Sequence, residues 1–440
     1  MDKRRVVITG MGIVSPLSLS IEEFWQRLIS GSGGVRSYFL DNADSDLVAP
    51  PVAVAAPALF EGKIGDFDSR DATQQKTIRK ALKLMSREIQ MAVAASCRAL
   101  NEAEIQIGQF PSDRIGISFG SDYIITTVED VLDGMRACFR SKPEGDQFDF
   151  SLWAENGKTK MPPLWQLKYL PNMPASHIAI LNDFHGPSNS ITLREASIGA
   201  CVGESVEIIA SNRADMMLVG TTGSRLHPFK MLHALKNEEL ASRECRPFDR
   251  HREGTVLGEG AGALVLEEYE HAVRRNATIW AEVVCGSYRA RFERTGLETG
   301  RNDHRREIVA SVLREVLRRA EMEPEQIGHI NAHGLGGPVS DRLEALGIHD
   351  VFGRRKKPIS VAAAKGFFGN LGAGAGAVEM IAGVLSLRNN QLFPTLNCHH
   401  PGPDCPVSPT IGCDMPAGDS FIKLAINAQA QASAVLIRKI

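Results

Sequence analysis

The sequence predicts an α/β fold, and three observations support this prediction. Short apolar runs rich in β-branched residues alternate with longer segments that repeat apolar residues at helical spacing. No flexible linker or low-complexity segment interrupts this alternation, so the parts are expected to pack as one body. With 440 residues, of which 43% are hydrophobic, the chain can bury a large core. Together these features predict buried, largely parallel sheets covered by helices.

The short runs are predicted as strands because they contain Val, Ile and Thr at high frequency and are bounded by turn residues. In chain order they are 6–9, 114–119, 188–193, 216–220, 263–266, 280–284, 327–332, 359–363 and 434–437. Longer amphipathic segments predict helices, clearest at 76–100, 201–211, 304–319 and 375–387. The segment 141–160 is polar and irregular, and it is predicted to be an insertion or a flap.

The charge balance excludes several classes of partner. The chain has 50 Lys and Arg and 52 Asp and Glu, a formal net charge of -2, so no global field favours nucleic acid. The opening MDKRRVVITGMG lacks the apolar centre of a secretory signal, and no stretch approaches the ~20 apolar residues of a membrane span. We therefore expect a soluble, cytoplasmic protein that binds no nucleic acid and spans no membrane.

Neither the cysteines nor the glycine-rich strings predict a metal or a cofactor. The string Cys398-His399-His400 and the nearby Cys405 resemble metal ligands, but they lie in a Pro- and Gly-rich loop without a second ligand pair. That setting favours reduced, structural thiols. The glycine strings 258–263 and 371–377 lack the features of a dinucleotide or P-loop site, which favours tight packing of helix on sheet over phosphate binding.

Several segments, taken in order, resemble the β-ketoacyl-[acyl-carrier-protein] synthase family of fatty-acid and polyketide synthesis. They are VVITGMGIVSPL (6–17), RPFDRHREGTVLGEGAGALVLEEYEHAVRRNATIWAEVV (246–284), NAHG (331–334), AAAKGFFGNLGAGAGAVE (362–379) and FPTLN (393–397). The resemblance runs essentially from end to end. It implies a thiolase fold, in which two similar halves, here 1–257 and 258–440, form one intertwined body of five layers, αβαβα. It also implies a dimer.

The resemblance implies a catalytic centre whose members are matched one by one. Such enzymes need a thiolate to accept an acyl chain, and two histidines to assist malonyl decarboxylation and hold the enolate. Counted forward from Gly186 and back from Asp215, the cysteine position holds Glu195, where a strand turns into a helix. The first histidine is His333. The second histidine position holds Asn370, which donates a hydrogen bond but carries no charge.

Other parts of the family pattern have also changed. The two threonines that bind the pantetheine arm correspond to Leu335 and Gly337, and the gate loop corresponds to 428–431, within a residue or two. The charged residues that surround the centre are retained: Lys365, Asp341, Glu344 and Glu379. For this group a satisfied ion cluster that stiffens the fold is favoured over a catalytic role, because buried charges are costly unless paired.

Glu195 cannot form the acyl thioester that condensation requires. We expect it to pair with His333 or Arg194 and to fill the former pocket. Cys201 is an alternative nucleophile, but it lies six residues too late along the chain and would point to a different side of the helix. A small buried apolar residue is the favoured role for Cys201.

A basic cluster points to a carrier protein. Arg79, Lys80 and Lys83 match the positions that family members present to the acidic acyl carrier protein, and their spacing places them on one helix face. A solvated face is the equally weighted alternative.

Four functions fit these observations. The favoured one is a chain-length-factor-like subunit that cannot condense by itself and forms a heterodimer with an active ketosynthase. The second is a malonyl-carrier-protein decarboxylase that uses His333 and Asn370. The third is an active synthase that uses Cys201, or a hydrolase that uses Glu195 as base. The fourth is a homodimer that binds an acyl chain or carrier protein and regulates another process.

Overall fold

The computed structural model describes residues 4–37, 54–143, 145–291 and 304–440. Its main sheet is mixed and joins two groups of strands in the order β13-β12-β11-β14-β15-β10-β1-β9-β8-β4-β7. The first group contains β7 (Ser188–Ile191), β4 (Ile115–Gly120), β8 (Met216–Ser224), β9 (Leu257–Glu268) and β1 (Val6–Val14). The second contributes β13 (Ser408–Pro409), β12 (Ser360–Ala362), β11 (His329–Asn331), β14 (Ser420–Ile426), β15 (Gln431–Arg438) and β10 (Ala281–Ala290).

The two groups repeat one pattern, as the resemblance predicts. In the first, β7, β4 and β8 are parallel, and β9 and β1 then pair antiparallel. In the second, β12, β11 and β14 are parallel, and β15 and β10 then pair antiparallel. The antiparallel pair β1–β10 joins the groups. The predicted boundary between residues 257 and 258 falls at the start of β9, and this division stays a prediction.

The expectation of largely parallel sheets is therefore only half right. Antiparallel strands usually alternate apolar and polar residues because one face meets solvent. Here β1 and β9 are antiparallel, yet every residue in both is buried, so both faces are covered. A continuous apolar run reports burial on both faces and does not distinguish the direction of pairing.

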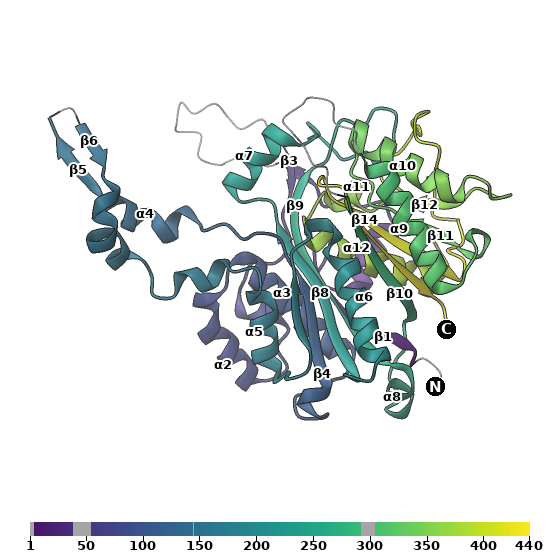
Figure 1. Cartoon of the computed structure of the whole chain (residues 1–440), viewed down its shortest axis with the longest axis horizontal. Helices are drawn as coiled ribbons and strands as arrows, with labels where there is room; N and C mark the ends of the chain where they lie inside the picture. Colours follow the sequence, from purple (N-terminus) through teal and green to yellow (C-terminus); the bar gives the residue numbers. More distant parts are fainter. Residues whose placement is uncertain (1–3, 38–53, 144, 292–303) are drawn as a thin grey trace.

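Helices complete five layers (Figure 1). The middle layer is α6 (Ser197–Ala210) with α12 (Gly374–Asn389), and each contacts strands of both groups. Helices α3 (Arg87–Glu102) and α5 (Met173–Asn182) cover the outer face of the first group, and α9 (Arg305–Ala320) with α10 (Pro338–Phe352) covers the second. The other helices are α1 (Ile21–Ile29), α2 (Ala72–Ala81), α4 (Val128–Arg136), α7 (Pro228–Asn237), α8 (Tyr269–Arg274) and α11 (Lys365–Phe368). No helix in the described part of the chain is long and apolar enough to cross a membrane.

The glycine strings pack the middle helix onto the sheet. A Cβ at Gly374 would lie 2.1 Å from the carbonyl oxygen of Gly260, and one at Gly262 would lie 2.9 Å from the Cβ of Ala377. Real Cβ atoms do not approach so closely, because the interior is already close-packed. The packing interpretation of these strings is confirmed.

The predicted helix 76–100 is wrong in one respect, because it is two helices. Helix α2 ends at Ala81 and a short 3-10 turn follows over Leu82–Leu84. Helix α3 starts afresh with Ser86 as its N-cap, where the hydroxyl accepts from the backbone N–H of Ile89 at 3.4 Å. A serine hydroxyl offers the backbone this alternative to a continuous helix.

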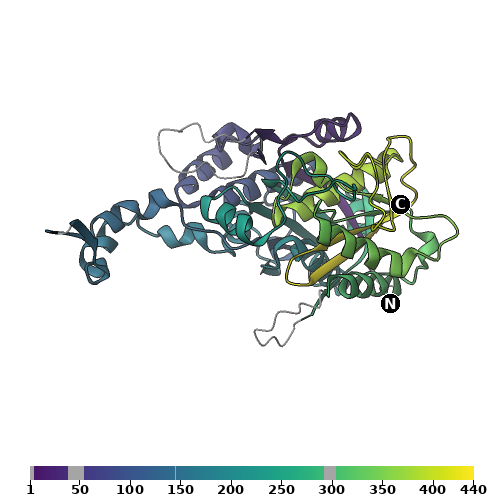
Figure 2. The same ribbon diagram turned by 90° about the horizontal axis from the view of Figure 1, so that it is seen from above.

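The segment between β4 and α5 forms an arm that projects from the body (Figures 1 and 2). It contains α4 and a hairpin of β5 (Phe139–Lys142) and β6 (Gly145–Phe148), followed by short turns. The rings of Phe139 and Phe148 pack 5.6 Å apart, which stabilises the hairpin. The predicted insertion at 141–160 is thus part of a longer structured projection. A smaller ladder pairs β2 (Arg36–Ser37) with β3 (Val54–Ala56), and β3 with β9.

Candidate functional site

An open pocket of about 660 Å³ lies where the two halves meet. Three predicted catalytic positions, Glu195, His333 and Asn370, line it together, although they are far apart in the sequence. The rest of its wall includes Leu335, the turn 426–430 and a set of charged groups. That set is Arg194, Arg225, Glu238, Glu239, Arg291 and Arg305.

Glu195 lies between β7 and α6, inside the short 3-10 helix Arg194–Ala196 that precedes α6. Its side chain is buried, with a relative exposure of 7% for the residue. Arg194, immediately before it, has a φ of 52°, in the left-handed region that is costly for a residue with a Cβ. The Ser197 hydroxyl accepts from the Leu193 N–H at 3.0 Å and closes the turn. The N-terminus of α6 favours a negative charge here.

The contacts of Glu195 differ from both predicted pairs. Its Oε1 accepts from Nδ2 of Asn370 at 3.1 Å and pairs with Nη1 of Arg225 at 3.4 Å. The predicted partner Arg194 instead faces Asp122, with Nε 3.6 Å from Oδ1. The other, His333, is held by Lys365 through its Nδ1, at 3.2 Å. Both pairings proposed from the sequence are wrong.

Arg225 is one of two site residues that sequence reasoning missed. It directly follows β8, is 7% exposed, and its Nη2 makes a second, short ion pair with Glu238. One guanidinium therefore serves two carboxylates, which its fork of donors allows. The only sequence signal is a charged residue in the connection between an apolar strand and a helix, and nothing local ties it to Glu195.

His333 belongs to a buried network behind the pocket wall. Its backbone N–H and that of Gly334 donate to the two oxygens of Glu344, at 2.7 and 2.8 Å. Lys365, in α11, donates to the carbonyl of His333 at 2.8 Å and forms an ion pair with Glu379. The loop that carries the imidazole is therefore fixed by charged groups on α10, α11 and α12.

A second lysine, also missed from the sequence, completes this cluster. Lys423, in β14, lies with its Nζ 2.7 Å from Oε2 of Glu379, and the side chains of Lys365, Lys423 and Glu379 are all fully buried. Burial lowers the pKa of Lys423. Burial also lowers the pKa of His333 well below its usual value, and the positive charges of Lys365 and Lys423 lower it further. The imidazole is neutral at physiological pH, so it can donate a hydrogen bond but supplies no charge.

The other two buried acidic residues, Asp341 and Glu344, accept hydrogen bonds from backbone amides. Asp341 accepts from the backbone N–H groups of Phe248, at 2.8 Å, and Gly336, at 2.9 Å, and so links two loops. Burial raises the pKa of Asp341 to about 6 and that of Glu344 to about 7. Both carboxyls hold backbone amides in place, and neither lines the pocket.

We expect neutral His333 to make stability depend on pH. Because its pKa is lowered in the folded chain, the unfolded state binds the proton first, and the contribution of the neutral ring is lost as pH falls below about 6.5. Relative to a His333→Asn variant, the free energy of unfolding should fall by about 1.4 kcal/mol per pH unit in this range. Denaturant unfolding of both proteins at pH 7.5 and 5.5 measures this change. A difference in unfolding free energy between the two proteins that is the same at both pH values would contradict the prediction.

The positions matched to the pantetheine-binding threonines have no hydroxyl. Leu335 lines the pocket, whereas Gly337 is the N-cap of α10. A Cβ at Gly337 would lie 2.0 Å from Oε2 of Glu239. The Glu239 carboxylate accepts from the N–H of Val339, at 3.1 Å, and from the Ser340 hydroxyl, at 3.3 Å, so it caps the helix.

The turn matched to the gate loop closes onto the turn that carries Glu195. Asn427, at the end of β14, donates from its Nδ2 to the carbonyl of Leu193 at 3.1 Å. Gln429 lines the pocket with its neighbours, and its Oε1 accepts from Nη1 of Arg194 at 3.5 Å. The turn 426–430 contributes aliphatic and amide side chains to the pocket, and none of its five residues is aromatic.

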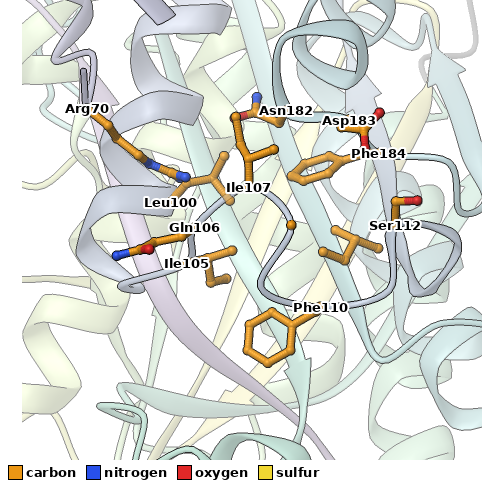
Figure 3. Close-up of a pocket in the computed structure, with 12 residues that line it drawn as sticks. Arg70, Leu100, Ile105, Gln106, Ile107, Phe110, Ser112, Asn182, Asp183 and Phe184 are labelled. Carbon is orange, nitrogen blue, oxygen red and sulfur yellow. The ribbon is translucent and has the colours of Figure 1, made fainter. Parts of the chain in front are cut away.

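A separate cavity of about 10 Å³ lies between Arg70, Leu100, Phe110 and Asn182 (Figure 3). This volume suits about one water molecule, so the cavity is no substrate pocket. Among the described residues, no group of three or more His, Cys, Asp or Glu side chains is arranged to hold a metal.

Comparisons with known proteins agree with this architecture. Residues 3–272 match the family "Beta-ketoacyl synthase, N-terminal domain", and residues 290–399 match "Beta-ketoacyl synthase, C-terminal domain". The 3-oxoacyl-[acyl-carrier-protein] synthase 2 of Coxiella burnetii is 32% identical over 413 residues, which are 92% of this chain and 91% of that protein. The enzyme of the same name from Vibrio cholerae is 31% identical over 410 residues, which are 91% of this chain and 90% of that protein.

Solved structures share the fold over its whole length. A β-ketoacyl synthase from Burkholderia phymatum superposes with a TM-score of 0.82 and 26% identity, covering 99% of this chain and 100% of its own. The ishigamide ketosynthase/chain length factor superposes with a TM-score of 0.81 and 24% identity, covering both chains completely. Two domain matches, relatives above 30% identity and a common fold agree: the chain belongs to the β-ketoacyl synthase family.

Proposed function

We propose that this chain is a chain-length-factor-like partner of an active ketosynthase and cannot condense acyl chains by itself. The observation that carries the proposal is the anchoring of Glu195 at the start of α6, by Asn370 at 3.1 Å and Arg225 at 3.4 Å. A carboxylate in this position cannot form the thioester on which condensation depends. The pocket and the buried charges around it would then shape and stabilise the subunit.

The other candidate nucleophile, Cys201, is a poor one. It is fully buried in the core, and it does not line the pocket. Burial raises its pKa to about 12, whereas a reactive cysteine is a thiolate near neutral pH. A synthase that uses Cys201 would have to unpack the middle layer of the fold.

The decarboxylase alternative receives less support. It requires His333 and Asn370 to receive the thioester carbonyl, yet the Asn370 amide already donates to Glu195 at 3.1 Å. The Glu195 carboxylate would also repel the carboxylate of a malonyl group. Sustained release of carbon dioxide from malonyl-carrier protein by the natural chain would favour this alternative.

The comparisons support the family, and the partner role stays our proposal. One structural neighbour is named a ketosynthase/chain length factor, and another is a type II polyketide acyl-carrier protein in complex with its ketosynthase. The curated relatives are named as 3-oxoacyl-carrier-protein synthases, so they support the family and not the loss of activity. We propose a cytoplasmic subunit that dimerises with a ketosynthase and contacts its carrier protein.

The partner role is tested by co-expression. The chain, untagged, is produced with each affinity-tagged ketosynthase of the same organism that retains the nucleophilic cysteine, and the complexes are weighed by native mass spectrometry. The proposal predicts one heterodimer with one copy of each chain, and a changed product length when the chain is present. Exclusive self-association of the chain, with unchanged products, would refute the role.

Carrier-protein contact gives a second test. Arg79 and Lys80, on α2, and Lys83, in the turn that follows, are all exposed. Exposed ion pairs contribute about 0.2–1 kcal/mol each, so a Lys80→Glu/Lys83→Glu double variant, which removes two of them, should bind the carrier protein about 2- to 30-fold more weakly. The matched control is Lys356→Glu/Lys357→Glu, at exposed lysines after α10. Equal weakening by both double variants, measured by surface plasmon resonance, would remove the docking assignment.

A further inference from the structure

Two hydrogen-bond donors converge on one oxygen of Glu195. Nδ2 of Asn370 lies 3.1 Å from Oε1, and Nη1 of Arg225 lies 3.4 Å from the same atom. The donors come from different halves of the fold, one after β8 and one after α11. Both residues are buried, at 1% exposure for Asn370 and 7% for Arg225, and both line the pocket.

These donors are held in place by groups other than Glu195. The backbone N–H of Arg225 donates to the carbonyl of Gly258 at 3.0 Å, and its Nη2 pairs with Glu238. The Asn370 N–H donates to the Val256 carbonyl at 2.7 Å. Its Oδ1 accepts from the N–H of Gly372 at 3.0 Å, which orients the amide so that Nδ2 faces Glu195. The pair of donors should therefore persist when Glu195 is removed.

We propose that Arg225 and Asn370 form a carboxylate-binding site in this pocket, and that Glu195 occupies it as a built-in ligand. A guanidinium and an amide N–H aimed at one oxygen suit a carboxylate, because the charged hydrogen bond is stronger than a neutral one. In the natural chain an external carboxylate must displace a covalently attached competitor, so the site is closed. This inference rests on the geometry alone and does not depend on the partner role.

Removing the built-in ligand should open the site to acetate. The Glu195→Ala substitution deletes the Cγ methylene and the carboxylate, a group equal in size and charge to an acetate ion. Acetate has four heavy atoms, so an affinity in the millimolar range is the expected scale. Titration of sodium acetate, followed by ¹³C relaxation of the labelled ion and by thermal unfolding, should show saturable binding to this variant.

Matched variants decide whether Arg225 and Asn370 form the site. Glu195→Gln fills the same space without the charge, so it should bind acetate no better than the natural chain. Adding Arg225→Met or Asn370→Ala to Glu195→Ala should weaken acetate binding at least 10-fold, and neutral acetamide should bind at least 10-fold more weakly than acetate. Glu195→Ser serves as a second opened variant if the alanine variant does not fold. Equal acetate affinity for the opened variants and Glu195→Gln, or affinity unchanged by Arg225→Met, would overturn the proposal.

Discussion

Replacing Glu379 with glutamine is expected to lower the free energy of unfolding by about 3–5 kcal/mol, because it leaves two buried ammonium groups without their carboxylate. Glu379 lies between Lys365 and Lys423, with 2.7 Å to the Nζ of Lys423, and all three side chains are fully buried. Glutamine has nearly the same shape as glutamate, so the loss of unfolding free energy reports the removal of the negative charge. Denaturant unfolding measures it.

The same cluster predicts an order among its members. Lys365→Met removes one of two lysines that share Glu379, and Lys423 still pairs with the carboxylate. We therefore expect Lys365→Met to be less destabilising than Glu379→Gln. Glu270→Gln, at an exposed position on α8, is the control and should stay within about 0.5 kcal/mol of the natural chain. A larger loss for Lys365→Met than for Glu379→Gln would show that the pairing of charges does not dominate.

The second large effect is expected from Glu195→Cys. This substitution places a thiol at the start of α6, beside Arg225, and both the helix N-terminus and a nearby cation favour the thiolate. Incubation with acyl-carrier protein should add one acyl group to most of the variant and none to the natural chain. Intact-mass spectrometry followed by peptide mapping measures the adduct.

Condensation should remain at background in this variant. Asn370 stands where a second histidine is expected, and Leu335 and Gly337, matched to the threonines that hold the pantetheine arm, have no hydroxyl. Adding Cys201→Ala should leave the adduct unchanged, because Cys201 is buried away from the pocket. An adduct that disappears with Cys201, or no adduct in Glu195→Cys, would place the nucleophile position elsewhere.

Local sequence patterns predict many of the strands and helices, but they do not predict whether neighbouring strands pair parallel or antiparallel. Apolar runs located the buried strands, and the glycine strings located the contact of Gly374 with Gly260. Burial on both faces removed the alternation that would have separated antiparallel from parallel pairing. The break at Ser86 was missed because apolar periodicity continues on both sides of a single capping hydroxyl.

The same division holds for the candidate site. Motif matching brought forward Glu195, His333 and Asn370, and the structure places all three around one pocket. Motif matching could not identify the partners of Glu195, because Arg225 follows a different strand and lies outside the segments that resemble the family. Lys423 was missed for a related reason, since an ion cluster is visible only when β14 and α12 are brought together.

The central claim, that this chain holds no acyl chain and condenses nothing by itself, is tested most directly on the natural protein. The protein is incubated with acyl- and malonyl-carrier protein, its intact mass is recorded, and carbon dioxide release is followed in the same reaction. We predict an unchanged mass and no carbon dioxide above that released by the malonyl-carrier protein alone. An acyl adduct on Cys201 or on any other residue, or sustained release of carbon dioxide, would contradict the claim.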